Sequence, residues 1–337
     1  MRQVWITKAG APDVLQVREA PGPDAAEGQV RVRVRAAGIN FADLMARVGL
    51  YPDAPKIPCV IGYEVSGTID QVGPGVTGLA VGQRVFAMPR FGGYTDTLVV
   101  AAGHAIQIPD SMSFEEAAAL PVVYLTAHHA MFFTGPLRQG SSVLVHSAAG
   151  GVGLAAIQLA KTRGCVIFGT ASASKLEFLR AQGCTHVIDS NADYVAAVRQ
   201  VVGERGIDLV LDPVGGPSWK KGFDLLGPTG RLVAYGFSAA AAGNKRNLLH
   251  AAWQLLQVKK YSPMELMDDN RTVTGVNMGH LFGRLDLLRP QLEELVAMVV
   301  AGQIKPHVDR TFSFDEAPAA HQYLHDRKAK GKVLLVP

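Results

Sequence analysis

The stretch that most constrains the fold is Ser141 to Lys161, which combines a short apolar segment, a glycine-rich turn and a helical pattern. Residues 142–146 form an apolar run of the kind found in a strand that is buried on both faces of a parallel sheet. After the turn, small and apolar side chains recur at helical spacing, at Val152, Ala155, Ala156 and Leu159. The stretch therefore predicts a strand, a tight turn and a helix, which form one βα unit of a parallel sheet.

The turn follows the pattern G-x-G-x-x-G, with Ala148, Gly150 and Gly153 at its three small positions. Gly150 lets backbone N–H groups approach a pyrophosphate, and Gly153 lets the helix pack closely on the strand. An ordinary turn rich in glycine and alanine is the alternative, but the order of strand, turn and helix favours nucleotide binding. The predicted contacts to the nucleotide come from Ala149, Gly150, Gly151, Val152 and Gly153.

The composition is that of a globular protein with room for two domains. The chain has 337 residues, of which 48% are hydrophobic and 18% charged. The net charge of +4 is small and the Lys and Arg residues are dispersed, so nothing predicts a nucleic-acid-binding surface. The three cysteines, Cys59, Cys165 and Cys184, lie far apart in the sequence, which is typical of a reducing cytoplasm. We find no signal-peptide pattern and no apolar run of about 20 residues that could span a membrane, so we expect a cytoplasmic protein.

The first third of the chain is rich in strand patterns separated by Pro and Gly. Val and Arg alternate strictly over residues 30–35, which predicts a strand with one buried and one wet face. From residue 142 onward strands alternate with helices, and such a series predicts a doubly wound parallel sheet. Its strands are expected at 142–146, 165–170, 186–188, 207–212, 231–236 and 272–276. The residues after 279 are too few for a domain of their own, so we expect them to fold back onto the N-terminal part.

Seven segments of the chain are similar to those of a known superfamily, the medium-chain dehydrogenases/reductases. They are residues 36–52, 61–85, 147–153, 212–216, 230–236, 275–281 and 331–337. Within the superfamily the chain resembles the zinc-free quinone oxidoreductase branch, and vesicle amine transport protein-like members in particular. The resemblance covers nearly the whole chain and implies an α/β fold of two domains. Residues 1–122 and 278–337 would form a GroES-like catalytic domain rich in strands, and residues 123–277 a Rossmann doubly wound parallel sheet that binds NADPH.

The resemblance also bears on metal content, because the zinc-dependent relatives have a cysteine at the position of Asn40 and a histidine at that of Tyr63. Neither Asn nor Tyr is a usual zinc ligand, and three scattered cysteines cannot form the relatives' four-cysteine structural lobe. We therefore predict that the chain has no metal site. Glu64, whose equivalent lies near the metal in zinc enzymes, is expected to have a structural hydrogen-bonding role here.

Cofactor preference depends on the residues after the second strand of the parallel sheet. A site that prefers NAD has Asp or Glu about 20 residues beyond the turn, whereas residues 168–175 offer hydroxyls and one lysine but no acid. The resemblance implies that Ser172 and Lys175 bind the 2′-phosphate of NADPH. It also places Gly236 and Asn277 at the cofactor, with Asn277 beside the nicotinamide. The alternative is that Ser172 caps the following helix and that Lys175 is simply solvated.

Without a metal, hydride can still add to an acceptor that is already polarised, such as a quinone, an enone or an enoyl thioester. Tyr51 resembles the tyrosine that enoyl thioester reductases of this superfamily use as a donor near the nicotinamide. Asn40 is expected to bond to the substrate or to the nicotinamide ribose, so the predicted catalytic residues are Tyr51 and Asn40. A lid or an anchor for the turn at Pro52 is an equally weighted alternative for Tyr51. Four histidines lack a sequence partner, and each is expected to be packed or to cap a helix: His128, His129, His146 and His280.

Residues 243–269 are the part that the resemblance explains least. They contain a helical apolar stripe of Leu248, Leu249, Ala252, Trp253 and Leu256, with one basic pair on each side, at 245–246 and 259–260. Peripheral contact with a membrane surface is one interpretation of this pattern. A roof over the substrate cleft or a dimer interface is the more common role of such a helix. Lys245 and Lys259 could also accept the phosphates of a CoA ester.

Two functions remain open at this point. The leading one is a zinc-independent, NADPH-dependent reductase that transfers hydride to a conjugated acceptor, either the C=C bond of an enone or enoyl thioester such as an enoyl-CoA, or a quinone. The alternative is a nucleotide-binding protein of the same fold, with vestigial catalysis and a binding or membrane-associated role. Relatives pair the strand equivalent to residues 272–276 across a dimer, so we expect a homodimer.

Overall fold

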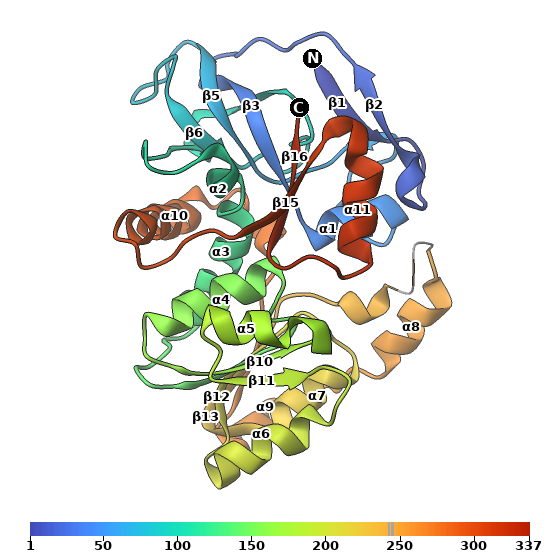
Figure 1. Ribbon diagram of the computed structural model, residues 1–337, viewed down its shortest axis with the longest axis vertical. Coiled ribbons are helices and arrows are strands. Elements are labelled where there is room, and N and C mark those ends of the chain that lie inside the picture. Colours follow the sequence, from blue (N-terminus) through green and yellow to red (C-terminus); the bar gives the residue numbers. More distant parts are fainter. Residues whose placement is uncertain (242, 244–245) are drawn as a thin grey trace. The chain divides into compact units, whose positions relative to one another are not determined.

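The chain divides into two units in the computed structural model, which describes residues 1–241, 243 and 246–337 (Figure 1). Unit 1 consists of Met1–Leu125, Gly243–Arg246 and Gly279–Pro337, so it contains both ends of the chain. Unit 2 consists of Thr126–Ala242 and Asn247–Met278. Unit 1 contains two β-sheets and unit 2 contains one, and each unit has its own buried core.

A parallel sheet forms the centre of unit 2, with the strand order β11-β10-β9-β12-β13-β14. Its strands are β9 (Ser142–Val145), β10 (Val166–Ala171), β11 (His186–Asp189), β12 (Ile207–Asp212), β13 (Leu226–Ala234) and β14 (Thr272–Gly275). The order runs outward in both directions from β9 and β12. This is the doubly wound sheet that the sequence predicted, and sheets of this kind bind ligands at the carboxyl ends of the strands where the order reverses.

Helices connect the strands of unit 2 (Figure 1). They are α4 (Gly151–Lys161), α5 (Leu176–Gln182), α6 (Tyr194–Val202), α7 (Pro217–Asp224), α8 (Leu248–Leu256) and α9 (Pro263–Asp269), and α3 (Pro121–His128) leads into the unit. All residues of β9 are buried, which confirms the prediction of a strand covered on both faces. The predicted apolar face of α4 is buried at Ala155, Ala156 and Leu159 and only partly buried at Val152.

Two sheets build unit 1. The larger has the order β15-β16-β3-β5-β6-β8, with β7 also paired to β3, and the smaller has the order β2-β1-β4. The strands are β1 (Arg2–Ile6), β2 (Leu15–Glu19), β3 (Gln29–Ile39), β4 (Cys59–Val60), β5 (Val65–Val72), β6 (Arg84–Ala87), β7 (Thr97–Ala101), β8 (Ala105–Gln107), β15 (Val308–Ser313) and β16 (Lys332–Val336). Along β3, Val30, Val32 and Val34 are buried while Arg33 and Arg35 are exposed, which confirms the predicted alternation.

The C-terminal residues complete the larger sheet of unit 1. β16 pairs antiparallel with β3, where Val333 lies opposite Ile39, and it pairs parallel with β15. The helices of this unit are α1 (Phe41–Val48), α2 (Phe114–Ala118), α10 (Leu285–Val300) and α11 (Ala317–His325). Because β16 lies next to β3, residues near position 330 come to lie beside residues near position 40.

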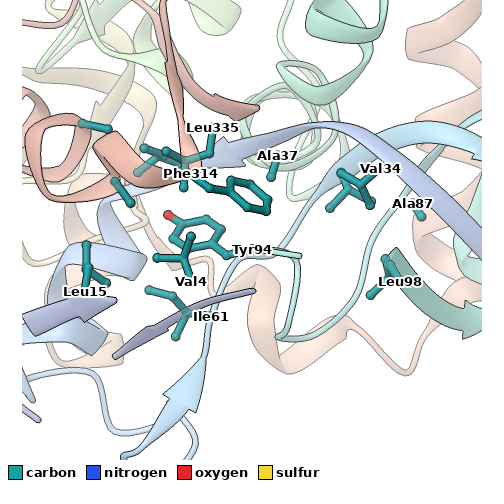
Figure 2. Close-up of a cluster of buried hydrophobic side chains, with 14 of the residues drawn as sticks. Val4, Leu15, Val34, Ala37, Ile61, Ala87, Tyr94, Leu98, Phe314 and Leu335 are labelled. Atoms are coloured by element: carbon teal, nitrogen blue, oxygen red, sulfur yellow. The ribbon is translucent and has the colours of Figure 1, made fainter. Parts of the chain in front are cut away.

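Figure 2 shows part of the apolar core of unit 1, where side chains from distant segments pack together. Tyr94 and Phe314 lie among aliphatic side chains that include Val4, Ile61 and Leu335. The Tyr94 hydroxyl is buried and lies 3.2 Å from Nε2 of His321. This core holds the end of β3 and the start of β5 in place, and these two segments carry Asn40, Tyr63 and Glu64.

Candidate functional site

The glycine turn of unit 2 lies between β9 and α4, as predicted. A Cβ atom on Gly153 would lie 2.5 Å from the carbonyl oxygen of Ala148 and 2.6 Å from that of Ser147, distances that real Cβ atoms do not adopt. Glycine is therefore required at this position for α4 to pack against the turn. Gly150 is the N-cap residue of α4, and among the described residues no side chain caps this helix. The N-terminal N–H groups of α4 and the positive end of its dipole therefore suit an anion such as a pyrophosphate.

The residues predicted to select the cofactor lie after β10, beside the glycine turn. Gly169 in β10 would bring an added Cβ to 3.1 Å from the Ala148 Cβ, so strand and turn are in close contact. Ser172 and Ser174 are exposed, with their Oγ atoms 3.4 Å apart. The Ser172 side chain makes no capping hydrogen bond in the part of the chain that the structure describes. This observation counts against the interpretation of Ser172 as a helix cap and leaves its hydroxyl for a ligand.

The last two predicted cofactor residues follow β13 and β14. A Cβ on Gly236 would lie 3.1 Å from the carbonyl oxygen of Pro213, so the backbone after β13 comes close to the loop after β12. Asn277 is exposed and follows β14. The carboxyl ends of parallel strands meet at one edge of the sheet, so the structure brings the turn, Ser172, Lys175, Gly236 and Asn277 to the same edge of unit 2.

One residue at this edge was missed by sequence reasoning. Asp212, at the end of β12, is fully buried, and its carboxylate accepts hydrogen bonds from the backbone N–H of Val214 (2.6 Å) and the hydroxyl of Ser218 (2.6 Å). It therefore shapes the loop that begins with the sequence DPVGG. His146 lies nearby, with Nδ1 3.0 Å from Oγ1 of Thr170, and burial lowers the pKa of His146. His146 is thus a packed, neutral histidine, as expected.

In unit 1, Asn40 is part of a buried charged network. Its Nδ2 donates to Oε1 of Glu64 (2.8 Å), and its Oδ1 accepts from the ammonium group of Lys332 (2.5 Å). Lys332 Nζ also lies 2.6 Å from Glu64 Oε1 and donates to the carbonyl oxygen of Ile39 (2.9 Å). The other oxygen of Glu64 accepts from the N–H of Val122 (2.7 Å). Glu64 therefore has the hydrogen-bonding role that was predicted for it, and the network fixes the orientation of the Asn40 amide.

Lys332 was not identified from the sequence. It is 3% exposed, and the signal that could have revealed it is a single charged residue at the start of the otherwise apolar strand β16. A lysine is rarely buried unless an acid pairs with it, so such a residue predicts a buried carboxylate as its partner. The sequence alone does not say which of the 29 acidic residues this is.

Asp43 connects the start of α1 to the turn before β5. Its Oδ2 accepts from the backbone N–H of Asn40 (2.8 Å) and its Oδ1 from that of Gly62 (3.1 Å). Burial raises the pKa of Asp43 to about 7. Since Gly62 immediately precedes Tyr63 and Glu64, this one carboxyl group positions the backbone on both sides of the network.

The residues at the positions of the zinc ligands do not suit a zinc ion. The positive charge of Lys332 lies within hydrogen-bonding distance of both Asn40 and Glu64 and would repel a divalent cation. Burial and the charge of Asp43 raise the pKa of Tyr63, so its hydroxyl is not available as an anionic ligand. In the described ranges, no group of three His, Cys, Asp or Glu side chains could hold a metal ion.

Tyr51 lies in an aromatic cluster of unit 1. Its ring is half-buried and meets the Tyr63 ring edge-on at a centroid distance of 6.4 Å, and Tyr63 in turn lies 5.3 Å from Phe91. Burial and the nearby charge of Asp53 raise the pKa of Tyr51. Tyr51 is therefore a neutral phenol that can donate a hydrogen bond, held by packing that is also consistent with an aromatic lid.

Two of the other histidines are packed, as expected, and the third is not. His128 and His129 are buried, with ring centroids 5.1 Å from Phe132 and 4.6 Å from Phe133. For His280 the expectation of packing or capping is wrong. Its side chain is 61% exposed and pairs with the carboxylate of Asp53, because the fold brings two segments together that are 227 residues apart in the sequence.

The apolar stripe of residues 243–269 forms α8 and is largely exposed. Leu249 and Leu256 are 86% and 84% exposed, and Leu248 and Trp253 are also exposed. Of the basic residues around this helix, Lys259 pairs with Glu265, and Lys245 lies outside the described residues. None of the helices that the structure describes is long and apolar enough to cross a membrane.

Two family models match the chain. The alcohol dehydrogenase GroES-like domain matches residues 26–110, and the zinc-binding dehydrogenase model matches residues 182–335. The human synaptic vesicle membrane protein VAT-1 homolog is 42% identical over 325 residues, which are 96% of this chain and 82% of that protein.

Solved structures resemble both units. The Escherichia coli quinone oxidoreductase, in complex with NADPH, is 30% identical and has a TM-score of 0.87, and the comparison covers all of both chains. The CurK enoyl reductase is 27% identical and has a TM-score of 0.84, over 99% of this chain and 98% of that chain. The similarity therefore includes the sheets of both units as well as the glycine turn.

Proposed function

Since this chain belongs to the medium-chain dehydrogenase/reductase superfamily, we propose that it is a zinc-independent, NADPH-dependent reductase of conjugated acceptors. The observation that carries this proposal is the carboxyl edge of the unit 2 sheet. There a helix N-terminus without a side-chain cap lies beside exposed hydroxyls and Lys175, with no acid between residues 168 and 175. The NADPH complex of the Escherichia coli quinone oxidoreductase supports the same cofactor for this chain.

The residues of unit 2 complement each charged part of NADPH. We assign the pyrophosphate to Ala149, Gly150, Gly151, Val152 and Gly153, whose N–H groups and small side chains allow close approach. Ser172 and Lys175 are assigned to the 2′-phosphate, since a hydroxyl and an ammonium group complement its charge. Gly236 and Asn277 are assigned to the nicotinamide end. Bound NADPH supplies the hydride that the acceptor takes up.

The residues of unit 1 orient the acceptor and stabilise the negative charge that develops on it. We assign the Tyr51 hydroxyl as hydrogen-bond donor to the carbonyl oxygen, where charge accumulates as the C=C bond is reduced. Nδ2 of Asn40 has one hydrogen beyond the one that it donates to Glu64, and we assign this hydrogen to the substrate or the nicotinamide ribose. The fixed amide orientation allows Asn40 to act without reorganising.

The acceptor is proposed to be a small enone or an enoyl thioester, and a quinone is the next candidate. The resemblance of Tyr51 to the donor tyrosine of enoyl thioester reductases favours the first class, and the similarity to the CurK enoyl reductase supports the same choice. The quinone oxidoreductase relatives support the other class. Both classes accept hydride without a Lewis acid, because their double bonds are conjugated to a carbonyl group.

NADPH oxidation measured with a panel of quinones, enones and enoyl-CoA esters tests this function. We expect turnover with at least one enone or enoyl thioester, with saturated aldehydes and alcohols inactive under the same conditions. Tight NADPH binding with no turnover on any member of the panel would contradict the proposal and favour a binding protein.

Cofactor selection gives a second expected result. Replacing Lys175 with alanine should raise the KM for NADPH by about tenfold or more and leave the KM for NADH nearly unchanged, because a charge-assisted hydrogen bond to phosphate contributes about 1.5–3 kcal/mol. Lys220→Ala is the matched control, since Lys220 is an exposed lysine of unit 2 that pairs with Asp224. Equal changes for both cofactors in Lys175→Ala would remove the assignment of Lys175.

A second candidate function is a nucleotide-binding protein whose role is binding to a membrane surface. The exposed apolar face of α8 favours it, as does the name of the human relative, a synaptic vesicle membrane protein. Flotation with anionic vesicles tests this candidate, and Leu249→Ser with Leu256→Ser should abolish flotation if α8 is the contact. Protein that stays at the bottom of the gradient argues for the reductase alone.

We also propose that the protein is a homodimer formed through β14. This strand is the last in the sheet of unit 2, so one of its edges has backbone groups free to pair with a second copy. Sedimentation velocity should give twice the mass of one chain. Gly275→Pro, which removes a donor from this edge, should shift the protein toward monomer, because the neighbouring Val276 N–H bonds to Ala234 in β13 and the Gly275 N–H faces the other side.

A further inference from the structure

An exposed histidine and a carboxylate form a pair beside Tyr51 in unit 1. Nε2 of His280 lies 2.9 Å from Oδ2 of Asp53. The His280 side chain is 61% exposed and that of Asp53 is 27% exposed, so the pair is in contact with solvent and is not part of the core. Neither residue is among those assigned above to the cofactor or to the substrate.

The Asp53–His280 pair lies close to the proposed donor. Asp53 is two residues after Tyr51, in a turn closed by a hydrogen bond from the Ala54 N–H to the Tyr51 carbonyl oxygen (3.1 Å). The charge of Asp53 contributes to the raised pKa of both Tyr51 and Tyr63. Arg90 acts on Tyr51 in the opposite sense.

Reduction of a conjugated C=C bond needs a proton as well as a hydride. The β carbon takes up the hydride as NADPH is oxidised to NADP⁺, and the electron pair of the C=C bond moves to give an enolate. A proton must then form a C–H bond at the α carbon. Tyr51 is well suited to donate a hydrogen bond to the enolate oxygen, but the tyrosinate left by a full transfer would be disfavoured next to the negative charge of Asp53.

We propose that His280, oriented by Asp53, is the acid that delivers the proton to the α carbon of the substrate. This role rests on the proposed function. Since an ionised carboxylate only accepts hydrogen bonds, Nε2 of His280 carries the hydrogen that Asp53 binds. Nδ1 of the imidazolium then holds the proton that is transferred to the α carbon, where the enolate electron pair forms the new C–H bond. The neutral imidazole left behind regains a proton from water, to which its side chain is open.

Histidine suits this task because imidazole gains and loses a proton near neutral pH, and a carboxylate partner fixes its tautomer and ring orientation. Asp53 is a positioning residue in this arrangement, since it acts only through His280. Reduction of a quinone does not require the pair, because both product oxygens can take protons directly from water. The two acceptor classes therefore differ in whether they need the His280–Asp53 pair: an enone or enoyl thioester needs it, and a quinone does not.

The test is reduction of an enone by NADPH in D₂O, with the configuration of the deuterium at the α carbon determined by NMR. The wild-type protein should place deuterium on one face only. His280→Gln should lower the rate with the enone by about 100-fold, the lower end for loss of a general acid, and place deuterium on both faces. Its rate with a quinone should not change. Asp53→Asn should weaken the facial selectivity and Asp53→Glu should restore it, whereas His325→Gln, at another histidine of unit 1, should match the wild type.

A measurement without substrate tests the same arrangement. The ¹⁵N shifts of the neutral His280 ring should show hydrogen on Nε2 in the wild type and a mixture of tautomers in Asp53→Asn. A wild-type ring with hydrogen on Nδ1 would overturn the proposal. So would an unchanged rate and unchanged facial selectivity in His280→Gln, and in that case the reductase function itself would stand. Failure of the wild type to reduce any acceptor would overturn both the role of His280 and the reductase function.

Discussion

Replacing Lys332 with methionine should lower the free energy of unfolding by about 3–5 kcal/mol, the range found when one partner of a buried ion pair is removed. Glu64 is fully buried, and without Lys332 its negative charge would keep only the hydrogen bonds from Asn40 and Val122. Methionine has nearly the length of the lysine stem, so the variant removes charge rather than volume. Urea unfolding followed by circular dichroism measures the change.

Two further variants separate the buried charge from other effects of the substitution. The double variant Glu64→Gln with Lys332→Met should recover part of the lost stability, because no unpaired charge remains. Lys328→Met is the matched control, since Lys328 is an exposed lysine whose ion pair with Asp326 contributes at most about 1 kcal/mol. Wild-type stability of Lys332→Met would mean that the network does not hold this part of unit 1.

Lys332→Met should also lower the turnover of the reductase. The Asn40 amide would lose the donor that binds its Oδ1, so it could rotate, and its fixed orientation toward a ligand would be lost. NADPH binding by unit 2 should be much less affected, because the turn and Lys175 belong to that unit. A comparison of NADPH affinity and turnover in the same preparation therefore distinguishes this effect from global unfolding.

The second large effect is expected for Gly153→Ala. The added Cβ would lie 2.5 Å from the Ala148 carbonyl oxygen and 2.6 Å from that of Ser147, and backbone atoms cannot yield as a flexible side chain does. The start of α4 must therefore move away from the turn, together with the N–H groups assigned to the pyrophosphate. We expect the Kd for NADPH to rise by about 10- to 100-fold, since a hydrogen bond to a charged group contributes about 1.5–3 kcal/mol.

A titration of NADPH fluorescence measures this affinity. Gly283→Ala is the matched control, because an added Cβ at Gly283 meets no atom within 4 Å and its backbone does not require glycine. That variant should bind NADPH as the wild type does. If Gly153→Ala binds NADPH with unchanged affinity, the turn is not the pyrophosphate site, and the proposed cofactor contacts would have to be withdrawn.

More of the candidate site could be predicted from the sequence in unit 2 than in unit 1. The cofactor residues of unit 2 follow strands of a regular parallel sheet, so periodicity and the glycine spacing predict both the strands and the edge at which they end. In unit 1, the resemblance to zinc enzymes indicated that Asn40 and Tyr63 replace a cysteine and a histidine that bind zinc. The sequence did not indicate that the ammonium group of Lys332 lies beside Asn40 and Glu64.

The sequence by itself determined the βα unit at residues 141–161, the doubly wound sheet and the absence of an acid after its second strand. These features are local, because each depends on side chains within a few residues or on a repeated period. Only the tertiary structure decided that Lys332 neutralises Glu64 and holds Asn40, and that Asp53 pairs with His280. The members of each pair are more than 200 residues apart, and no local pattern selects one partner among many charged residues. The pairing of β16 with β3 and the return of the chain to unit 1 after residue 279 bring these partners together.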